Sequence, residues 1–315
     1  MNTDNQSKTT ILKYAKYPFT PLLGWSISRY EVFDKCKRCY YYTYYSRHCT
    51  EIPHYKLTKL RELTSVPLEV GNVIHHVIEA FLHRLQLSDS DIDEERFFQF
   101  GLKKAKEYFS SKTFIETYYG RVKEIDFQRA VKKIERCLNN FLQSPCYSWI
   151  FMKAITNRDN WMIEPGGMGE TRLNGMKAYC KMDFLFPVGD EVHILDWKTG
   201  AKDYAKHSTQ LIGYAAAASS NFDISYERII PRIVYLSPEY DEMSIQLSTE
   251  KIEEFIDTVR EQTDRMYSYC KEVDRNIPLS IDNFPKSPSP SLCRYCNYQE
   301  LCFPKGLGEE EEEEF

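Results

Sequence analysis

Two apolar runs at 176–186 and 191–198 flank a Gly-Asp pair at 189–190, which is typical of a two-residue β-hairpin turn. The turn fixes the register of the hairpin, and this register places Asp183 directly opposite Asp196. Side chains that face each other in this way lie about 4.5 to 5.5 Å apart at Cβ, so the two carboxylates would share a small volume. The sequence therefore predicts a strand pair that concentrates negative charge at one place.

A cation has to offset this charge, because two like charges at that distance repel each other. Lys198 follows Asp196 by two residues and so lies on the same face of the strand. The other candidate is a divalent metal, and hard oxygen ligands favour Mg²⁺ or Mn²⁺. The alternative is an ordinary solvated ladder of cross-strand charges formed by Asp183, Asp196, Lys181 and Lys198.

A helix predicted over about 68–87 supplies a candidate for a further ligand. Its apolar residues recur at helical spacing, and His75 shares a face with Glu79 beside that apolar stripe. Such a histidine is often a boundary residue, but next to an acidic site it is a candidate imidazole ligand. His76 is the rival, because one residue of helical rotation separates the two.

Strands and helices are interleaved along the chain, which favours an α/β or α+β layered fold. Besides the hairpin, we expect strands in 161–173, 228–236 and 243–248, and helices over 26–48, 205–219 and 250–271. The segment 88–160 has helical periodicity and is predicted to be a helical insertion. No GxxxxGK[ST] phosphate loop occurs, so no ATP-driven motor is recognisable.

The formal net charge is −5, but Glu309–Glu314 alone contribute six negative charges, so the rest of the chain is nearly neutral. This excludes a domain that binds nucleic acid by charge alone, and it leaves room for a local or metal-assisted contact. No apolar run is long enough for a signal peptide or a membrane span. We therefore expect a soluble, cytoplasmic protein that does not act on membranes.

Ten cysteines in a chain with no export signal argue against a disulfide framework. The last three form a C-x2-C-x5-C pattern at 293–302, after a Pro- and Ser-rich connector at 276–292. Together with Cys36 and Cys39, the first two of them have the spacing of a four-cysteine zinc site.

Taken in chain order, several short motifs resemble the PD-(D/E)XK nuclease superfamily. They are SxSRY followed by Cys36, GxxxH at 71–75, Asp183, DWK at 196–198, QxxxY at 210–214 and the cysteines at 293–302. The resemblance is closest to the RecB-like branch, which includes CRISPR-associated exonucleases with an iron–sulfur cluster and the AddB nuclease domain. It covers residues 26–48, 70–82, 164–215 and 288–304, and it leaves the helical insertion unexplained.

The resemblance implies a restriction-endonuclease-like α/β core, in which a central mixed sheet is flanked by helices. With it, the chain is expected to comprise an N-terminal extension (1–25), N-terminal core helices (26–87), the helical insertion (88–160), the nuclease sheet with its catalytic hairpin (161–275), a connector with a cysteine cluster patch (276–304) and an acidic tail (305–315).

The resemblance also implies roles for individual residues. The divalent metal, Mg²⁺ or Mn²⁺, would be held by three side chains and one backbone carbonyl: His75, Asp183, Asp196 and Trp197. Lys198 would position or deprotonate the attacking water. Gln210 and Tyr214 would line the site and touch the DNA strand. Glu170 is a candidate for an accessory acidic residue, but its position favours packing or solvation as its role.

For the cysteines, the resemblance implies a [4Fe-4S] cluster held by four thiolates: Cys36, Cys293, Cys296 and Cys302. The alternative is a structural zinc ion, which would use Cys39 and leave Cys302 spare. Either site would cross-link the N-terminal helix to the C-terminal segment.

The expected function is metal-dependent DNA hydrolysis, exonucleolytic on single-stranded or resected ends, in repair, recombination or CRISPR and mobile-element processing. A separate helicase, CRISPR or recombination protein is the expected partner, given the missing motor. One alternative is a non-catalytic DNA-binding subunit of a helicase-nuclease or integration complex, against which the complete set of His75, Asp183, Asp196 and Lys198 argues. Another is a redox-sensing cluster protein, which does not require the carboxylates.

Overall fold

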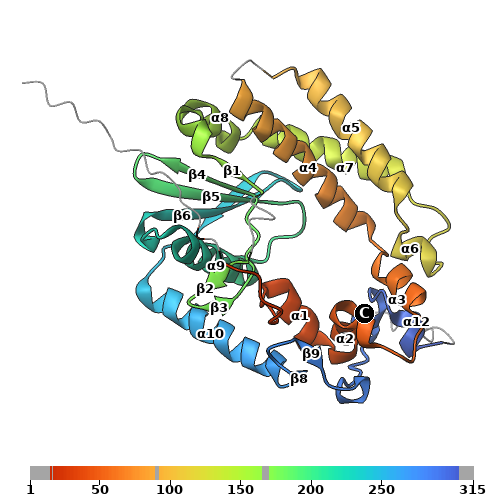
Figure 1. The fold of residues 1–315 in the computed structure, drawn as a ribbon. Helices are drawn as coiled ribbons and strands as arrows, with labels where there is room; N and C mark the ends of the chain where they lie inside the picture. The colour runs from red at the N-terminus through yellow and green to blue at the C-terminus, as the bar shows by residue number, and fades with distance from the viewer. Residues whose placement is uncertain (1–14, 16, 89–91, 165–169, 305–315) are drawn as a thin grey trace, which may run out of the picture. The chain divides into compact units, whose positions relative to one another are not determined.

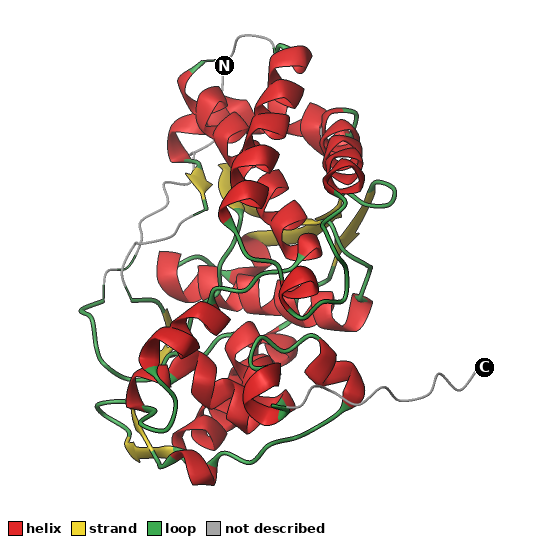
Figure 2. Ribbon diagram, turned by 90° about the vertical axis from the view of Figure 1, so that its right-hand side faces the viewer, coloured by secondary structure: helices red, strands yellow, loops and turns green. Residues whose placement is uncertain are grey.

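The computed structural model describes residues 15, 17–88, 92–164 and 170–304. Within these ranges the chain forms two compact units, each assembled from separate segments. We call them the sheet unit (up to 20, 66–111 and 126–261) and the cysteine unit (21–65, 112–125 and 262 onward). Helices make up most of the described chain, and the strands are short (Figure 2). The predicted acidic tail at 305–315 lies outside the described residues.

The sheet unit is built on a mixed five-stranded sheet in the order β1-β4-β5-β6-β7. Its strands are β1 (Met162–Ile163), β4 (Phe184–Val188), β5 (Glu191–Lys198), β6 (Ile229–Tyr235) and β7 (Asp241–Ser244). β5 and β6 are parallel, and the other neighbours are antiparallel. A separate small ribbon pairs β2 (Arg172–Leu173) with β3 (Met176–Lys177). The expected α/β class, a central mixed sheet flanked by helices, is confirmed.

Helices cover both faces of this sheet, with α4 and α7 on one side and α9 on the other (Figure 1). The helices of the unit are α4 (Val66–Leu87), α5 (Glu94–Ser111), α7 (Phe127–Leu142), α8 (Pro145–Met152), α9 (Tyr204–Phe222) and α10 (Thr249–Tyr267, which ends in the cysteine unit), with 3₁₀ turns at Ala154–Asn160 and Tyr226–Arg228. Because β5 connects to its parallel neighbour β6 through α9, the sequence between these strands forms a βαβ crossover.

The core of the sheet unit continues from the sheet into the predicted insertion. Trp197 of β5 packs edge-on against Phe141 of α7, with ring centroids 5.4 Å apart. Side chains of α5 and α8 belong to the same buried cluster, including Phe97 and Ile150. The helices α5, α7 and α8, which lie in 88–160 and belong to the sheet unit, therefore share one hydrophobic core with the sheet.

The cysteine unit consists of short helices and one small ribbon. Its elements are α1 (Ile27–Lys35), α2 (Lys37–Tyr44), α3 (His54–Arg61), α6 (Ile115–Tyr118), α11 (Pro290–Arg294) and α12 (Gln299–Cys302), with 3₁₀ turns at Ser46–His48 and Ile281–Asn283 and strands β8 (Cys270–Glu272) and β9 (Ile277–Pro278). Its core is aromatic, and Phe33, Tyr40, Tyr41, Tyr45 and Phe284 are all buried.

Two predicted elements are interrupted. The helix expected over 26–48 begins at its Ser26 cap but breaks at Cys36, whose backbone is extended and whose Sγ accepts from Cys39 N to cap α2. The strand expected over 176–186 forms only at its two ends, as β3 and β4. Among the described residues, no helix is long and apolar enough to cross a bilayer.

His193 in β5 makes the stability of the sheet unit sensitive to acid. Its ring lies 4.7 Å from that of Trp149 and 5.7 Å from that of Phe186. Burial, helped by the charge of Arg232, lowers the pKa of His193 to about 4, even though Glu191 Oε2 lies 3.2 Å from His193 Nε2. The unfolded chain, with a pKa of about 6.5, therefore binds the proton first as the pH falls, and stability falls between these two values.

Replacing His193 with phenylalanine should remove this acid sensitivity. Between about pH 7 and about pH 5, we expect the wild type to lose about 2 kcal/mol more stability than His193→Phe. Urea denaturation of both proteins at the two pH values measures the difference. An equal loss in both proteins would show that His193 does not titrate as described.

Candidate active site

The predicted register of the β4–β5 hairpin is confirmed. Val188 pairs with Glu191 at the turn, and Phe184 pairs with Leu195 at the other end of β4. Asp183 directly precedes β4, where the backbone pairing with β5 has ended. Its side-chain Oδ2 accepts a hydrogen bond from Trp197 N at 2.8 Å. The carboxylate of Asp183 is thus fixed against the backbone of β5, next to Asp196.

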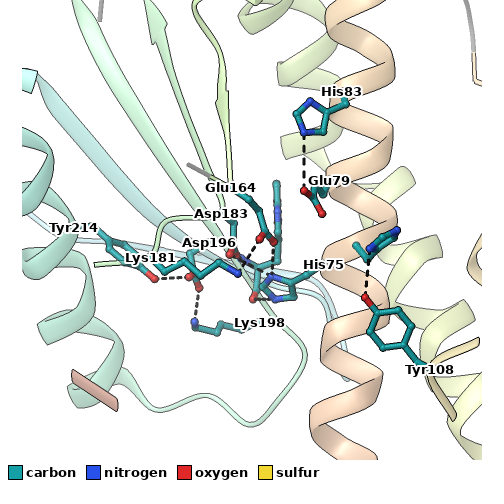
Figure 3. Close-up of polar contacts among 12 residues, drawn as sticks. His75, Glu79, His83, Tyr108, Glu164, Lys181, Asp183, Asp196, Lys198 and Tyr214 are labelled. Carbon is teal, nitrogen blue, oxygen red and sulfur yellow. Dashed lines mark hydrogen bonds and ion pairs between the residues drawn. The ribbon is translucent and has the colours of Figure 1, made fainter. Parts of the chain in front are cut away.

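A third acidic residue extends this pair into a row. β1 pairs with β4 so that Ile163 faces Phe184, and one further step of this register brings Glu164 beside Asp183. Glu164 N donates to Asp183 O at 2.7 Å, which confirms the placement. Glu164 directly follows β1, Asp183 directly precedes β4 and Asp196 lies in β5, so the three acids are neighbours across the sheet, and Asp183 and Asp196 are buried (Figure 3).

His75 reaches this row from α4 (Figure 3). Its Nδ1 lies 3.2 Å from Asp183 Oδ1 and 4.0 Å from Glu164 Oε1, and its Nε2 donates to the Trp197 carbonyl at 2.9 Å. One turn earlier, a Cβ on Gly71 would lie 3.4 Å from the Thr199 hydroxyl, so α4 runs close to the residue that follows β5.

His76, the rival, is used differently. Its ring packs against Tyr108, whose hydroxyl lies 3.4 Å from His76 Nδ1. Of the two neighbouring histidines, it is therefore His75 that contacts the predicted carboxylate pair.

The acids and the histidine perturb one another strongly. Burial disfavours the imidazolium of His75, but the charge and hydrogen bond of Asp183 outweigh it and raise the pKa of His75 to about 9. Burial and the nearby charge of Asp183 raise the pKa of Asp196 to about 6. The pKa of Asp183 is lowered despite burial, because His75 carries a positive charge. These shifts show that Asp183 and Asp196 lie close enough to repel each other and that Asp183 attracts a positive charge.

Asp196 binds Lys198 and residues of α9. Lys198 Nζ lies 2.5 Å from Asp196 Oδ2, as expected for two residues on one face of β5. Tyr214 donates its hydroxyl to Asp196 Oδ1, and Gln210 in turn donates to the Tyr214 hydroxyl. The predicted Gln210 and Tyr214 therefore form a hydrogen-bonded chain that ends on the carboxylate.

All six predicted side chains line one cavity of about 530 Å³. They are His75, Asp183, Asp196, Lys198, Gln210 and Tyr214. Three ligand atoms from His75, Glu164 and Asp183 lie within 4.8 Å of one another, which is a donor set that can hold a metal ion. Glu79 and Lys181 also line the cavity, and Lys181 pairs with Glu164 at 2.8 Å.

Glu170, considered as an accessory acid, is a packing residue instead. It is buried, pairs with Lys177 at 3.0 Å and with Arg172, and accepts hydrogen bonds from Thr20 N and Oγ1. Sequence reasoning missed Glu164, because the two-residue strand before it carries too little pattern to indicate its pairing with β4.

Replacing Glu164 or Glu170 with glutamine should have different effects on Mn²⁺ affinity and on stability. Glu164→Gln should lower Mn²⁺ affinity at least about tenfold and leave stability nearly unchanged. Glu170→Gln should leave Mn²⁺ affinity unchanged and lower stability by about 2 kcal/mol, because it leaves buried cations without a charged partner. Calorimetric Mn²⁺ titration and urea denaturation of both variants measure these effects. If Glu170→Gln weakened Mn²⁺ binding and Glu164→Gln did not, the roles assigned to the two residues would be wrong.

The cysteine unit brings five cysteines around a second cavity, of about 240 Å³. They are Cys36, Cys39, Cys293, Cys296 and Cys302. Cys296 Sγ lies 3.9 Å from Cys39 Sγ, and Cys293 Sγ accepts a hydrogen bond from Ser289 N. All four thiols predicted for an iron–sulfur cluster line this cavity, and so does the Cys39 of the zinc alternative.

The mixed sheet and the hairpin that carries two aspartates and a lysine are those of a restriction-endonuclease-like fold. A model of the PD-(D/E)XK nuclease superfamily matches residues 24–303, so the chain belongs to this superfamily. Membership implies a metal-dependent nuclease that binds DNA. None of the curated proteins with which the chain was compared matches it.

Proposed function

We propose that this protein is a metal-dependent deoxyribonuclease that degrades single-stranded or resected DNA from its ends. One observation carries the hydrolytic proposal: within one cavity, the donor set of His75, Glu164 and Asp183 lies beside the Lys198–Asp196 pair. The preference for ends is supported by the resemblance to the exonucleases of the RecB-like branch. The same resemblance supports a cytoplasmic role in repair, recombination or CRISPR processing, with a helicase or a CRISPR or recombination protein as partner.

The donor atoms fit a hard divalent cation such as Mg²⁺ or Mn²⁺. Neighbouring ligands of an octahedral Mg²⁺ at about 2.1 Å lie about 3 Å apart. His75 Nδ1 and Asp183 Oδ1 are 3.2 Å apart, and the raised pKa of His75 indicates that these carboxylates draw positive charge to this point. We assign the cation to His75 Nδ1, Asp183 and Glu164, with Asp196 as a further ligand. The Trp197 carbonyl, the backbone ligand that the resemblance implies, accepts the hydrogen bond of His75 Nε2 in the structure.

A bound Mg²⁺ or Mn²⁺ would supply charge neutralisation at the phosphate and a nucleophilic water at neutral pH. Lys198 is placed to orient that water or to take its proton, and its ammonium adds a second positive charge for the phosphate oxygens. Asp196 fixes the Lys198 ammonium through its Oδ2.

Gln210 and Tyr214 are assigned to positioning. Their hydrogen-bonded chain fixes the second oxygen of Asp196 and occupies the α9 side of the cavity. A DNA strand that enters the cavity would meet both side chains, in agreement with the role that the family resemblance implies.

For the cysteine unit we propose a [4Fe-4S] cluster on Cys36, Cys293, Cys296 and Cys302. All four of these thiols line one cavity, and a C-x2-C-x5-C pattern with a distant upstream cysteine is the set that the family resemblance implies for the cluster. The observation in favour of zinc is the Cys39–Cys296 contact, since sulfur ligands of one zinc ion lie about 3.8 Å apart. Broad visible absorption and equal amounts of iron and acid-labile sulfide support the cluster, and stoichiometric zinc would contradict it.

The activity is tested on linear and circular single-stranded DNA of the same sequence, with Mn²⁺ and with EDTA. We expect the linear DNA to be shortened, the circle to persist, and EDTA to stop the reaction. Cleavage of the circle would contradict the preference for ends, and hydrolysis in EDTA would contradict the metal. DNA retention without hydrolysis would instead support a non-catalytic DNA-binding subunit.

A further inference from the structure

The cavity of the cysteine unit is lined by one thiol more than a [4Fe-4S] cluster uses. Five cysteines line the cavity, and four thiolates hold such a cluster, each on a separate iron. Cys39 is the fifth on the assignment above, so its role there is unexplained. This inference rests on the proposed cluster site.

Cys39 lies directly against one of the assigned ligands. Cys296 Sγ donates to Cys39 Sγ at 3.9 Å, and among the residues that the structure describes no other pair of cysteine sulfurs makes such a contact. Cys39 lies in the first turn of α2, where its backbone N–H is bound by Cys36 Sγ. The start of α2 therefore holds Cys39 beside Cys296.

The two thiols are close enough to bond to each other. A disulfide needs sulfurs about 2.05 Å apart, with Cβ atoms about 3.5 to 4.5 Å apart, so the sulfurs must approach by about 2 Å. Cys296 lies between α11 and α12 and not inside a helix, so this segment can adjust while α2 stays in place. Both residues are only half-buried, which leaves them accessible to a small reagent.

We propose that Cys39 is a resolving thiol that captures Cys296 in a disulfide when the metal has left. The oxidant is a low-molecular-weight disulfide such as oxidised glutathione. The Cys296 thiolate attacks one sulfur of glutathione disulfide, forms a mixed disulfide on Cys296 and releases one glutathione thiolate. The Cys39 thiolate then attacks Cys296 Sγ, closes the Cys39–Cys296 bond and releases the second glutathione, so two protein thiols are oxidised and one disulfide is reduced.

This bond would have two consequences. It removes Cys296 from the ligand set, so that the cluster cannot be rebuilt until the disulfide is reduced. It also joins α2 to the C-terminal segment in place of the metal, which preserves a long-range cross-link between two distant parts of the chain. The pair would then protect Cys296 from irreversible oxidation during cluster loss.

The test uses the full-length protein from which metal has been removed with bipyridyl and EDTA under dithiothreitol. After removal of the reductant, oxidised glutathione is added, and tryptic peptides are analysed by mass spectrometry. Cleavage gives peptide 39–47 with Cys39 as its one cysteine and peptide 295–305 with Cys296 and Cys302, which fragment ions distinguish. We expect these two peptides to be joined through Cys39 and Cys296.

Two variants make the result decisive. Cys39→Ser should retain the iron of the wild type and, once metal-free, should carry glutathione on Cys296 in place of the internal bond. Cys49→Ser, which changes a cysteine outside the cavity, should behave as the wild type. A bond from Cys296 to any other cysteine, or loss of the metal in Cys39→Ser, would overturn the proposal. Because thiol pairing is read by mass, failure of the proposed nuclease activity would not alter this result.

Discussion

Replacing Lys198 with alanine should lower the rate of DNA hydrolysis by at least about a thousandfold. Lys198 Nζ lies 2.5 Å from Asp196 Oδ2, in the same cavity as the donor set, so its removal takes away the cation nearest to the proposed reacting phosphate. Mn²⁺ affinity should be retained, because Lys198 is not a ligand. Initial rates on end-labelled single-stranded DNA and calorimetric Mn²⁺ titration measure the two effects separately.

Lys202→Ala is the matched control. Lys202 follows β5 by four residues and pairs with Asp241 outside the cavity, so its loss should leave the rate unchanged. A Lys198→Ala variant that still cleaves DNA at a rate close to that of the wild type would exclude Lys198 from the chemistry. A rate lost together with Mn²⁺ affinity would show that Lys198 supports the metal site instead.

Changing Asp183 to asparagine should weaken metal binding and nearly abolish hydrolysis. The amide can still accept the hydrogen bond from Trp197 N, so the hairpin should persist, but the charge that faces His75 is lost. We expect Mn²⁺ affinity to fall at least about tenfold and the hydrolysis rate to fall by about a thousandfold or more. Titration with Mn²⁺ and the same rate assay measure this.

Asp190→Asn is the control for this variant, since Asp190 lies in the turn of the same hairpin and is exposed. It should leave metal affinity and rate unchanged. If Asp183→Asn binds Mn²⁺ as tightly as the wild type, the cation does not bind at Asp183 and the assignment of the donor set is wrong.

The parts of the site that depend on short-range register could be predicted from the sequence. The Gly-Asp turn fixes the β4–β5 pairing, and this pairing alone brings Asp183, Asp196 and Lys198 together. Helical spacing then places His75 on one edge of its helix, and only the choice between His75 and its neighbour needed the structure. The family resemblance supplied the roles of these residues, which the variants above test.

The parts that depend on pairing between distant segments could not be predicted. Glu164 joins the site because β1 pairs with β4, about twenty residues away, and a two-residue strand carries too little pattern to indicate its partner. The strand expected over 176–186 is interrupted at 178–183. At Asp183 it is the side chain, and not the backbone carbonyl, that accepts the hydrogen bond from Trp197 N.

Helix periodicity likewise predicts a helix without indicating what it packs against. The segment 88–160 has the expected helices, but their apolar faces extend the core of the sheet, as Phe141 against Trp197 shows. A similar limit applies to Cys36, where a side-chain cap competes with a continuous helix and breaks it.

The location of bound Mn²⁺ in crystals of the full chain tests the central claim most directly. The account predicts an anomalous scattering peak in the cavity, about 2.0 to 2.3 Å from an oxygen of Asp183 and a nitrogen of His75. The absence of a peak there from crystals soaked in saturating Mn²⁺, or a peak only elsewhere on the protein, would contradict it.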